Sequence, residues 1–222
     1  MIFFARLGLT FILVVTFVPG SNCQSMTDLF RLLPSAYTPE LNSKEKEILI
    51  ERGEYIIPGG DSNETVRYSM DTTEGKNYLR CEYSFTTGQR AFSIIEIKKL
   101  RKTNGEFILV FSQYAGVPVE FDEREFKIYD IKNGKLTESR GNMIPKNIGL
   151  KELLKNGISD SLLAAIEKSS CPSFDLMSER ENEIEFRIYF PDSEDEYKSY
   201  MIGNAILLSW NGMSFTKKII ND

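Results

Sequence analysis

The chain has 222 residues, of which 41% are hydrophobic, and a formal net charge of −5. This length and composition suffice for one large domain or for two small packed lobes. The acidic balance excludes a nucleic-acid platform, because phosphate binding needs clustered Lys and Arg. We therefore predict no nucleic-acid partner, and we interpret the acidity as a contribution to solubility.

The N-terminus has the features of an export signal. Met1–Arg6 carries one positive charge, and the apolar run Leu7–Val18 has the length of a signal peptide and is too short for a comfortable membrane span. We predict that residues 1–23 are a signal peptide cleaved after Cys23, so that Gln24 begins an exported chain. The alternative is lipoprotein processing, in which Cys23 is retained and acylated, and only this alternative gives the protein a membrane partner.

The fate of Cys23 also decides how many other cysteines can pair. With Cys23 removed or acylated, Cys81 and Cys171 remain as an even pair in an oxidising compartment. A disulfide between them would tie the two halves of the chain together, whereas two separate buried thiols would behave as small hydrophobes. The sequence does not give the Cα separation that a bridge requires. Both options stay open, and the separate thiols are preferred.

Two short helices are predicted after the signal. The first covers Ser25–Leu33, is capped at its first residues and ends at Pro34. A linker at Ser35–Pro39 follows. Asn42 and Glu45 then have the spacing of a capping box, which predicts a second helix that Gly53 ends.

The stretch Tyr55–Asn77 is rich in turn residues, and one short strand is predicted within it at Val66–Met70. An Asp-x-Asn-x-Thr spacing at 61–65 begins like a calcium loop, but valine follows where glycine is needed. We therefore predict a solvated turn there and no metal site.

Four antiparallel strands are predicted over Tyr78–Thr137. Apolar and polar residues alternate in Tyr78–Phe85, with the period of a strand that has one buried face. The next run, Phe92–Lys99, has no wholly polar face, which indicates a central strand or one covered on both sides. Phe107–Phe111 is apolar throughout, as expected of a central strand.

Turn residues separate these strands. Thr86–Gln89 is predicted to be a short hairpin loop, and Tyr114–Arg124 a longer loop with a glycine and a proline. The pairs Asn104-Gly105 and Asn133-Gly134 favour type I′ turns, whose twist matches that of the flanking strands.

The second half repeats this order of elements. After a linker at Ser139–Asn147, two short helices are predicted at Gly149–Lys155 and Asp160–Lys168, the second capped by Ser159. An acidic loop is predicted at Pro191–Glu196, and Asn211-Gly212 forms a further turn of the Asn-Gly type. The predicted strands are Phe174–Met177, Glu183–Phe190, Tyr200–Trp210 and Met213–Lys218.

The two halves align at a fixed offset. Asn133-Gly134 and Asn211-Gly212 lie 211 − 133 = 78 residues apart, and the same offset sets Glu106–Gln113 roughly against Ile184–Pro191. We predict a tandem helix-helix-four-strand duplication, with repeats at 24–140 and 141–222 in one compact unit. The alternative is two unrelated meanders that both carry Asn-Gly turns for local reasons. The expected class is α+β, mainly antiparallel sheet with short helices.

The search for catalytic residues is largely negative. The chain has no histidine, which removes Ser-His-Asp and Cys-His nucleophile systems and His-ligated zinc. It also has no nucleophile elbow, P-loop or dinucleotide fingerprint. We predict a non-enzymatic protein without cofactor or metal. The alternative is carboxylate chemistry such as glycoside hydrolysis, although a solvated surface is the preferred interpretation of the candidate acids, which are Glu82, Glu96, Glu120, Asp122 and Glu123.

Four aromatic residues are singled out as candidate ligand contacts. Exposed Tyr and Trp side chains often mark surfaces that bind sugars or proteins. Most aromatic residues of this chain lie at positions with the two-residue period of a strand, for which packing is the default. The candidates are Tyr114, Tyr129, Tyr200 and Trp210.

The opening QSMTDLFRLLP, followed by LNSKEKEILIERGE, resembles a group of uncharacterised exported proteins of Bacteroidetes. The TGQR turn, the segment KIYDIKNGKLT and the closing LLSWNGMSF also resemble that group, so the likeness spans most of the chain. It implies a Gram-negative periplasmic or envelope setting and brings no catalytic residues. The helix-helix-four-strand outline is similar to the β-lactamase-inhibitor-protein fold. We expect a binding module of the bacterial envelope whose unknown partner is a protein or glycan.

Overall fold

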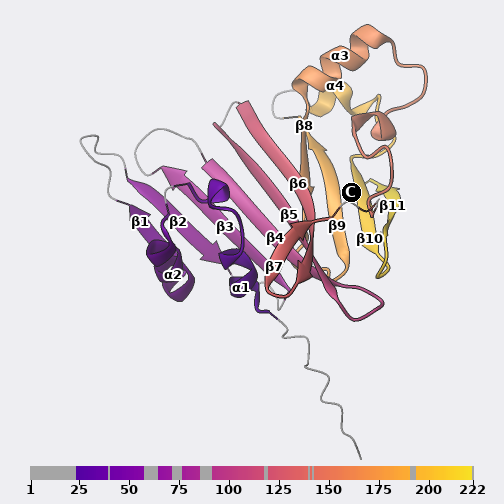
Figure 1. Ribbon diagram of the computed structural model, residues 1–222. Helices are drawn as coiled ribbons and strands as arrows, with labels where there is room; N and C mark the ends of the chain where they lie inside the picture. The colour runs from indigo at the N-terminus through magenta and orange to yellow at the C-terminus, as the bar shows by residue number, and fades with distance from the viewer. Residues whose placement is uncertain are drawn as a thin grey trace, which may run out of the picture.

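The computed structural model describes residues 24–39, 41–57, 65–71, 77–85, 92–117, 120–139, 141, 143–190 and 194–221. Within these ranges the chain forms two antiparallel sheets, one of seven strands and one of four, with short helices beside each (Figure 1). This confirms the predicted α+β class with mainly antiparallel sheet. The predicted signal peptide with Cys23, most of the calcium-like spacing and the predicted loop Thr86–Gln89 lie outside the described residues.

The first sheet is a meander, because each strand pairs with its neighbours in the chain. The prediction that Tyr78–Phe85 is a strand is confirmed, and Phe107–Phe111 forms the first part of a longer one. The third and fifth strands flank the fourth, which is buried on both faces as predicted. The strands are β1 (Glu54–Ile57), β2 (Val66–Asp71), β3 (Tyr78–Phe85), β4 (Phe92–Arg101), β5 (Phe107–Val117), β6 (Glu120–Lys132) and β7 (Lys135–Glu138).

Short helices cover one face of this sheet (Figure 1). They are α1 (Met26–Arg31), the 3₁₀ helix η1 (Ser35–Tyr37) and α2 (Ser43–Arg52). Capping boxes begin both α-helices, formed by Ser25 with Asp28 and by Asn42 with Glu45. Each such cap stabilises its helix by about 1 kcal/mol. α2 ends as predicted at Gly53, whose φ of 74° is strained for other residues.

Alternation along β3 directs one set of its side chains at these helices. Leu79 and Cys81 are buried there together with Leu29 and Phe30 of α1 and Leu49 of α2. These β3 positions belong to the apolar face that the sequence predicted. Burial of each large apolar side chain contributes about 1.5–3 kcal/mol, so this cluster holds the helices on the sheet.

The second sheet is a four-stranded meander in the spatial order β11-β10-β9-β8. The predicted alternation in Glu183–Phe190 is confirmed, because Ile184, Phe186 and Ile188 are buried in one cluster. Ser159 caps the helix before the sheet, as predicted. The elements are η2 (Leu150–Leu153), α3 (Asp160–Ser169), β8 (Cys171–Asp175), β9 (Glu183–Tyr189), α4 (Glu194–Lys198), β10 (Ala205–Trp210) and β11 (Phe215–Ile220).

The two sheets pack through the face of the first sheet that lies opposite its helices. Leu100 of β4 and Val110 of β5 share one buried cluster with Ile184, Phe186 and Leu208 of the second sheet. The same strands present charged and tyrosine side chains further along this face, so the apolar contact covers only part of their length.

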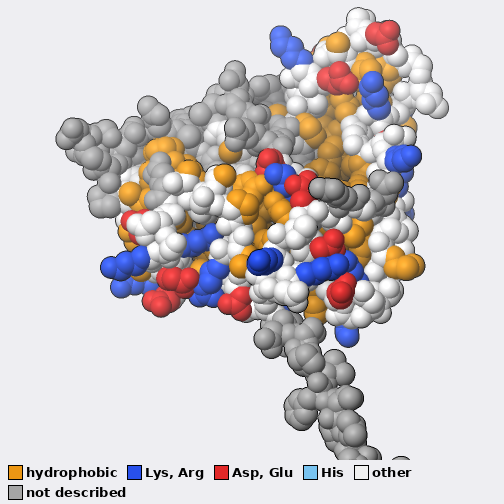
Figure 2. All heavy atoms as spheres, in the orientation of Figure 1, with side chains coloured by type: hydrophobic (Ala, Val, Ile, Leu, Met, Phe, Trp, Pro, Cys, Tyr) orange, Lys and Arg blue, Asp and Glu red, His pale blue; other side chains and the backbone are white. Residues whose placement is uncertain are grey.

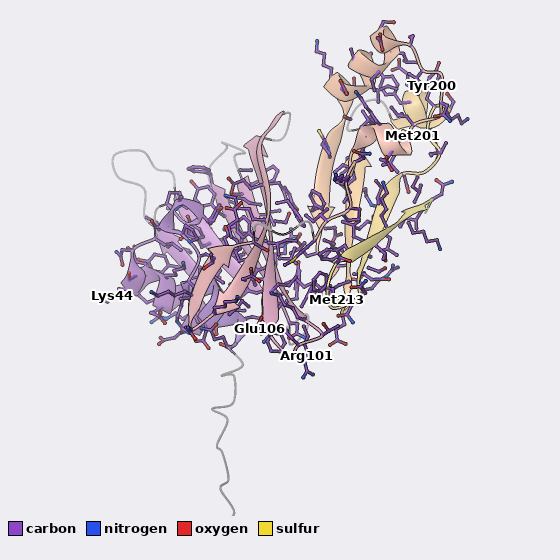
Figure 3. The ribbon with its side chains drawn as sticks, turned by 45° about the vertical axis from the view of Figure 1, so that its right-hand side comes forward. Lys44, Arg101, Glu106, Tyr200, Met201 and Met213 are labelled. Carbon is purple, nitrogen blue, oxygen red and sulfur yellow. The ribbon has the colours of Figure 1, made fainter. Side chains whose placement is uncertain are left out.

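Hydrogen bonds join the hairpin ends of the two sheets. The indole Nε1 of Trp210 donates to the carbonyl oxygen of Arg101 at 2.7 Å. The backbone N–H of Thr103 donates to the carbonyl oxygen of Gly212 at 3.0 Å. Figure 3 shows Arg101 and Met213 at this end of the molecule. Trp210 therefore belongs to the interface between the two sheets.

The two cysteines within the described residues are free thiols. Cys81 is buried on the helix-covered face of the first sheet, and Cys171 is half-buried on β8 of the second. The option of a disulfide between the halves is therefore wrong for this structure, and the separate thiols hold. Burial raises the pKa of the Cys81 thiol to about 12, which suppresses the reactive thiolate.

The predicted loop at Tyr114–Arg124 is wrong. β5 continues to Val117 and β6 begins at Glu120, so the two strands pair through most of this stretch. The register shifts between Ala115 and Val117, because one residue of β5 lies there opposite two residues of β6. Pairing with the neighbouring strand satisfies the backbone hydrogen bonds, and this outweighs the weak strand propensity of glycine.

Of the three Asn-Gly pairs for which such turns are predicted, one forms the type I′ turn. Asn133 and Gly134 have φ angles of 50° and 71°, as that turn requires. At Asn104 and Asn211 the prediction is wrong, because neither has a positive φ. Their side-chain oxygens instead accept the backbone N–H two residues later, at 3.1 and 2.9 Å. These contacts stabilise other turn geometries.

The count of four strands is wrong for the first half, which has seven. The difference arises mainly because β1 and β2 extend the sheet beside β3. β4–β7 and β8–β11 are both four-strand meanders, and duplication stays a prediction. The predicted acidic loop Pro191–Glu196 contains the start of α4, whose last turn carries Lys198 as suits the helix dipole. Gly149–Lys155 holds a short 3₁₀ helix, and the strand predicted from Tyr200 begins only at Ala205.

The outer surface mixes the two signs of charge. On the face shown in Figure 2, described Lys and Arg side chains lie among Asp and Glu side chains along the lower rim. Exposed ion pairs such as Arg31 with Glu47 and Arg67 with Glu54 are of this kind. Solvent and salt screen such pairs, so they contribute little to stability.

Candidate functional site

A polar surface arises where the strands of the first sheet extend beyond the apolar contact with the second. Alternate residues of a strand point to the same face. On β3, Tyr78 is followed on that face by Arg80 and Glu82, and on β4 Leu100 is followed in the reverse direction by Lys98 and Glu96. The face thus changes from apolar to charged along both strands.

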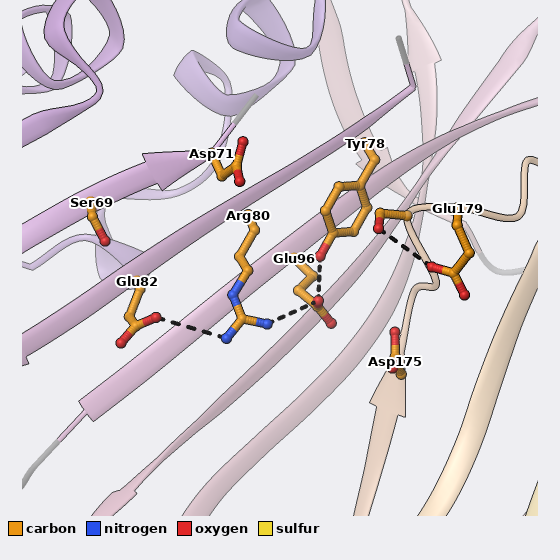
Figure 4. Close-up of a pocket in the computed structure, with 9 residues that line it drawn as sticks. Ser69, Asp71, Tyr78, Arg80, Glu82, Glu96, Asp175 and Glu179 are labelled. Atoms are coloured by element: carbon orange, nitrogen blue, oxygen red, sulfur yellow. Dashed lines mark hydrogen bonds and ion pairs between the residues drawn. The ribbon is translucent and has the colours of Figure 1, made fainter. Parts of the chain in front are cut away.

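This surface forms one wall of a cavity of about 460 Å³ between the sheets (Figure 4). The opposite wall consists of Asp175, at the end of β8, and of Ser178 and Glu179 in the loop that follows. Figure 4 shows Asp175 across the cavity from Glu96. The wall on the first sheet consists of Ser69, Asp71, Tyr78, Arg80, Glu82 and Glu96.

A second cavity of about 280 Å³ continues the first. It shares Arg80, Glu96 and Asp175 with the first cavity, so the two form one cleft. Its other walls are more apolar and come mainly from β8, with one tyrosine from β5 and one from β9. These additional residues are Tyr114, Cys171, Pro172, Ser173, Phe174 and Tyr189. We call the first cavity the acidic half of the cleft and the second its aromatic half.

Glu96 lies at the centre of the cleft floor. Its carboxylate accepts a short hydrogen bond from the Tyr78 hydroxyl, and one oxygen lies 3.5 Å from Nη1 of Arg80. Arg80 also pairs at 3.8 Å with Glu82. Burial raises the pKa of Glu96, opposed by the Tyr78 hydrogen bond and by the positive charge of Arg80. Burial also raises the pKa of Tyr78 above its ordinary range, and the Glu96 charge adds to this.

Lys98 fixes the opposite wall. Its side chain is only 1% exposed, and its ammonium donates to carbonyl oxygens of the loop between β8 and β9. The acceptors are the carbonyl oxygens of Leu176, Met177, Arg180 and Glu183. Burial lowers the pKa of Lys98 to about 8, and nearby acids oppose this shift. Because the same loop carries Ser178 and Glu179, Lys98 positions that side of the acidic half.

Three aromatic rings line the aromatic half, those of Tyr114, Phe174 and Tyr189, and they differ in how firmly they are held. Phe174 stacks on Phe126 with ring centroids 3.9 Å apart, and its carbonyl oxygen accepts a hydrogen bond of 3.0 Å from the Ser112 hydroxyl. These contacts tie the outer edge of β8 to the first sheet. Tyr189 is 49% exposed and is available for stacking. Burial raises the pKa of Tyr114 and also that of Tyr189.

The structure brings together only some of the residues that the sequence singled out. Tyr114 lines the aromatic half. Trp210 and Tyr129 are buried in the two cores, so packing explains them. Tyr200 is exposed but lies just after α4, at the end of the second sheet (Figure 3), and is not among the residues that line the cleft.

Of the five candidate acids, the structure brings two to the cleft. Glu82 and Glu96 line one cavity. Glu120, Asp122 and Glu123 lie in β6 instead of the predicted loop. Sequence reasoning missed the cleft residues Arg80, Asp175 and Tyr189, although one signal was available. Glu96 and Lys98 share a strand face with Phe92 and Ile94, and charged residues on a buried face often mark a site.

Among the residues that the structure describes, no group of three or more His, Cys, Asp or Glu side chains is placed to hold a metal ion. Within the same ranges, no helix combines the length and apolar character needed to cross a membrane.

No protein-family model matches the chain, and no curated protein matches it by sequence. The fold is similar to that of a domain of an uncharacterized protein from Porphyromonas gingivalis W83, a member of Bacteroidetes. The TM-score is 0.58 at 12% sequence identity, and the match covers 87% of this chain and 97% of that domain. At this identity the likeness shows the fold alone. It agrees with the resemblance to uncharacterised proteins of Bacteroidetes.

Proposed function

We propose that this protein is a non-catalytic binding module that takes a protein or glycan ligand in the cleft between its sheets. The polar floor of the cleft supports this most directly. Glu96 is buried, and its desolvation costs folding free energy that the attraction of Arg80 need not repay. An apolar floor would let the sheets pack more closely, so the charged floor is better explained by a ligand. Cavities with a few convergent polar groups are typical of binding sites.

The proposed setting is the periplasm or cell envelope of a Gram-negative bacterium. The apolar run Leu7–Val18, the breaking Pro19-Gly20 pair and the small residue before Cys23 at position 21 support export. Acylation of Cys23 would place the same module on a membrane surface.

Two exposed tyrosines provide a matched test of the cleft. Tyr189 lines it and is 49% exposed, whereas Tyr200 is 38% exposed and lies elsewhere. The wild-type protein and the Tyr189→Ala and Tyr200→Ala variants are immobilised and exposed to an envelope extract. A ligand retained by wild type and Tyr200→Ala, but bound about tenfold more weakly by Tyr189→Ala, supports the cleft as the site. Equal retention by all three proteins contradicts it.

A second function, carboxylate-dependent hydrolysis of a glycan, is favoured by the environment of Glu96. Burial raises the pKa of its carboxyl group, as is needed in a general acid that protonates a leaving glycosidic oxygen. Asp175 offers a second carboxyl group in the same cavity, for the role of base or nucleophile. Release of reducing ends from soluble glycans, reduced about hundredfold or more in Glu96→Gln, is the expected result. No release by the wild-type protein removes this function.

A further inference from the structure

We propose that the cleft selects a positively charged ligand, an extended basic segment of a protein whose Lys or Arg side chain enters the acidic half. This inference rests on the proposed binding function and narrows it from a protein or glycan to a cationic peptide. The ligand residues beside the charged one lie against the aromatic half.

The charge of the lining supports a cationic ligand. The acidic half contains five carboxyl groups and one arginine; the acids are Asp71, Glu82, Glu96, Asp175 and Glu179. Arg80 pairs with two of these, Glu82 and Glu96. Lys98 offsets part of the remaining charge, but its ammonium is directed at backbone carbonyl oxygens. An entering cation is therefore attracted, whereas an entering phosphate or carboxylate meets like charges.

This concentration of acids contrasts with the outer surface. Along the rim visible in Figure 2, described acidic and basic side chains are interspersed. Inside the cleft, acids approach from both sheets, since Glu82 comes from β3 and Asp175 from β8. Charges that converge in a cavity with low-dielectric walls produce a stronger local field than the same charges spread over a surface.

The aromatic half gives an independent reason for a cation with an apolar stem. Tyr189 is about half exposed and Phe174 is held rigidly by stacking on Phe126. Aromatic faces attract Lys and Arg head groups, and the methylene stems of these residues pack on apolar surfaces. The two halves share Arg80, Glu96 and Asp175. The cleft thus continues past the charged pocket, which suits a peptide with neighbouring side chains better than a small amine.

Isothermal titration calorimetry with defined probes tests this inference. The probes are end-blocked pentalysine, the same peptide with every side-chain amine acetylated, end-blocked pentaglutamate and the N-acetylglucosamine tetramer. The cleft variant is Glu82→Gln with Asp175→Asn. The matched control is Glu51→Gln with Glu167→Gln, which removes the same formal charge from exposed positions on α2 and α3. Unfolding midpoints establish that both variants are folded.

We expect pentalysine to bind wild type and the control equally, and the cleft variant about tenfold more weakly. The acetylated peptide and pentaglutamate should bind at least about tenfold more weakly than pentalysine. Equal weakening in the control and the cleft variant would show general attraction to an acidic protein and overturn the inference. Comparable binding of the acetylated peptide would also overturn it.

The proposed function has its own, separable outcome. If the N-acetylglucosamine tetramer binds, pentalysine does not, and Tyr189→Ala removes the tetramer, the cleft is a binding site and its cationic selectivity is refuted. If pentalysine does not bind and envelope ligands are retained equally by Tyr189→Ala and Tyr200→Ala, both the inference and the proposed function fail.

Discussion

The side-chain ammonium of Lys98 lies 2.7 Å from the carbonyl oxygen of Leu176, and this contact joins β4 of the first sheet to the loop after β8 of the second. Met177 and Glu183 offer further carbonyl oxygens to the same ammonium at 2.7 and 2.8 Å. The loop therefore curls around one cation supplied by the other sheet. Because Ser178 and Glu179 belong to this loop, the shape of the cleft depends on that cation.

Lys98→Met is expected to lower the free energy of unfolding by about 3 kcal/mol, because buried carbonyl oxygens lose a charged donor. Methionine keeps the apolar length of the side chain, so most of the loss reflects the hydrogen bonds. Urea denaturation measures the change, with the exposed Lys44→Met on α2 as control. Equal stability of Lys98→Met and Lys44→Met would show that the loop does not depend on the ammonium.

Trp210→Phe is expected to destabilise the protein by about 1–2 kcal/mol, because the carbonyl oxygen of Arg101 loses its indole donor. Phenylalanine retains most of the packing against Phe215, whose ring centroid lies 5.0 Å from that of Trp210. Ligand binding in the cleft should remain within about twofold of wild type, since the residue does not line it. A variant of normal stability that loses ligand binding would contradict this structural role.

The sequence predicts those parts of the fold that depend on local signals. The capping boxes at Ser25 and Asn42 and the alternation in β3 are each set within a few neighbouring residues. Trp210 shows the limit of such signals. Its place beside a turn favours exposure, yet that turn packs against Thr103 of another hairpin. Contacts between hairpins that are distant in the chain leave no recognisable pattern in the amino-acid sequence of either hairpin.

The cleft could not be predicted for the same reason. The sequence places Glu82 and Glu96 on predicted strands, but the cavity depends on how far the second sheet covers the first. Asp175 reaches them only because β8 is the edge strand nearest that face. The pattern of a single sequence shows which face of a strand is buried. It does not show which other element packs against that face.

Cys171 is expected to react with a thiol reagent such as iodoacetamide about a hundredfold or more faster than Cys81 in the folded protein. Cys171 is half-buried at the cleft, whereas Cys81 is buried and has a pKa raised to about 12. Mass spectrometry of digested protein after timed labelling measures both rates. Equal rates in urea provide the control. Failure of both to react until a reductant is added would reveal a disulfide and contradict the free thiols.

Glu96→Gln is expected to remove a pH dependence of stability. Burial raises the folded-state pKa of Glu96 above the ordinary value of 4.5. In the interval between the unfolded and folded pKa values, the folded protein keeps a proton that the unfolded chain has lost. Stability from this group is therefore fully present below about pH 4.5 and falls as the pH rises through the folded pKa. Each unit between the two pKa values corresponds to about 1.4 kcal/mol.

Glutamine cannot ionise, so the free energy of unfolding of Glu96→Gln should lack this fall. The stability of the variant relative to wild type should then increase from pH 4.5 toward neutrality, as the buried carboxylate of the wild type becomes charged. Urea denaturation at a series of pH values measures the difference, and the exposed Glu51→Gln should follow wild type throughout. If the curves of Glu96→Gln and wild type run parallel, Glu96 has the same pKa in the folded and unfolded states. Its ionisation would then cost nothing, because Arg80 and Tyr78 would fully compensate its burial.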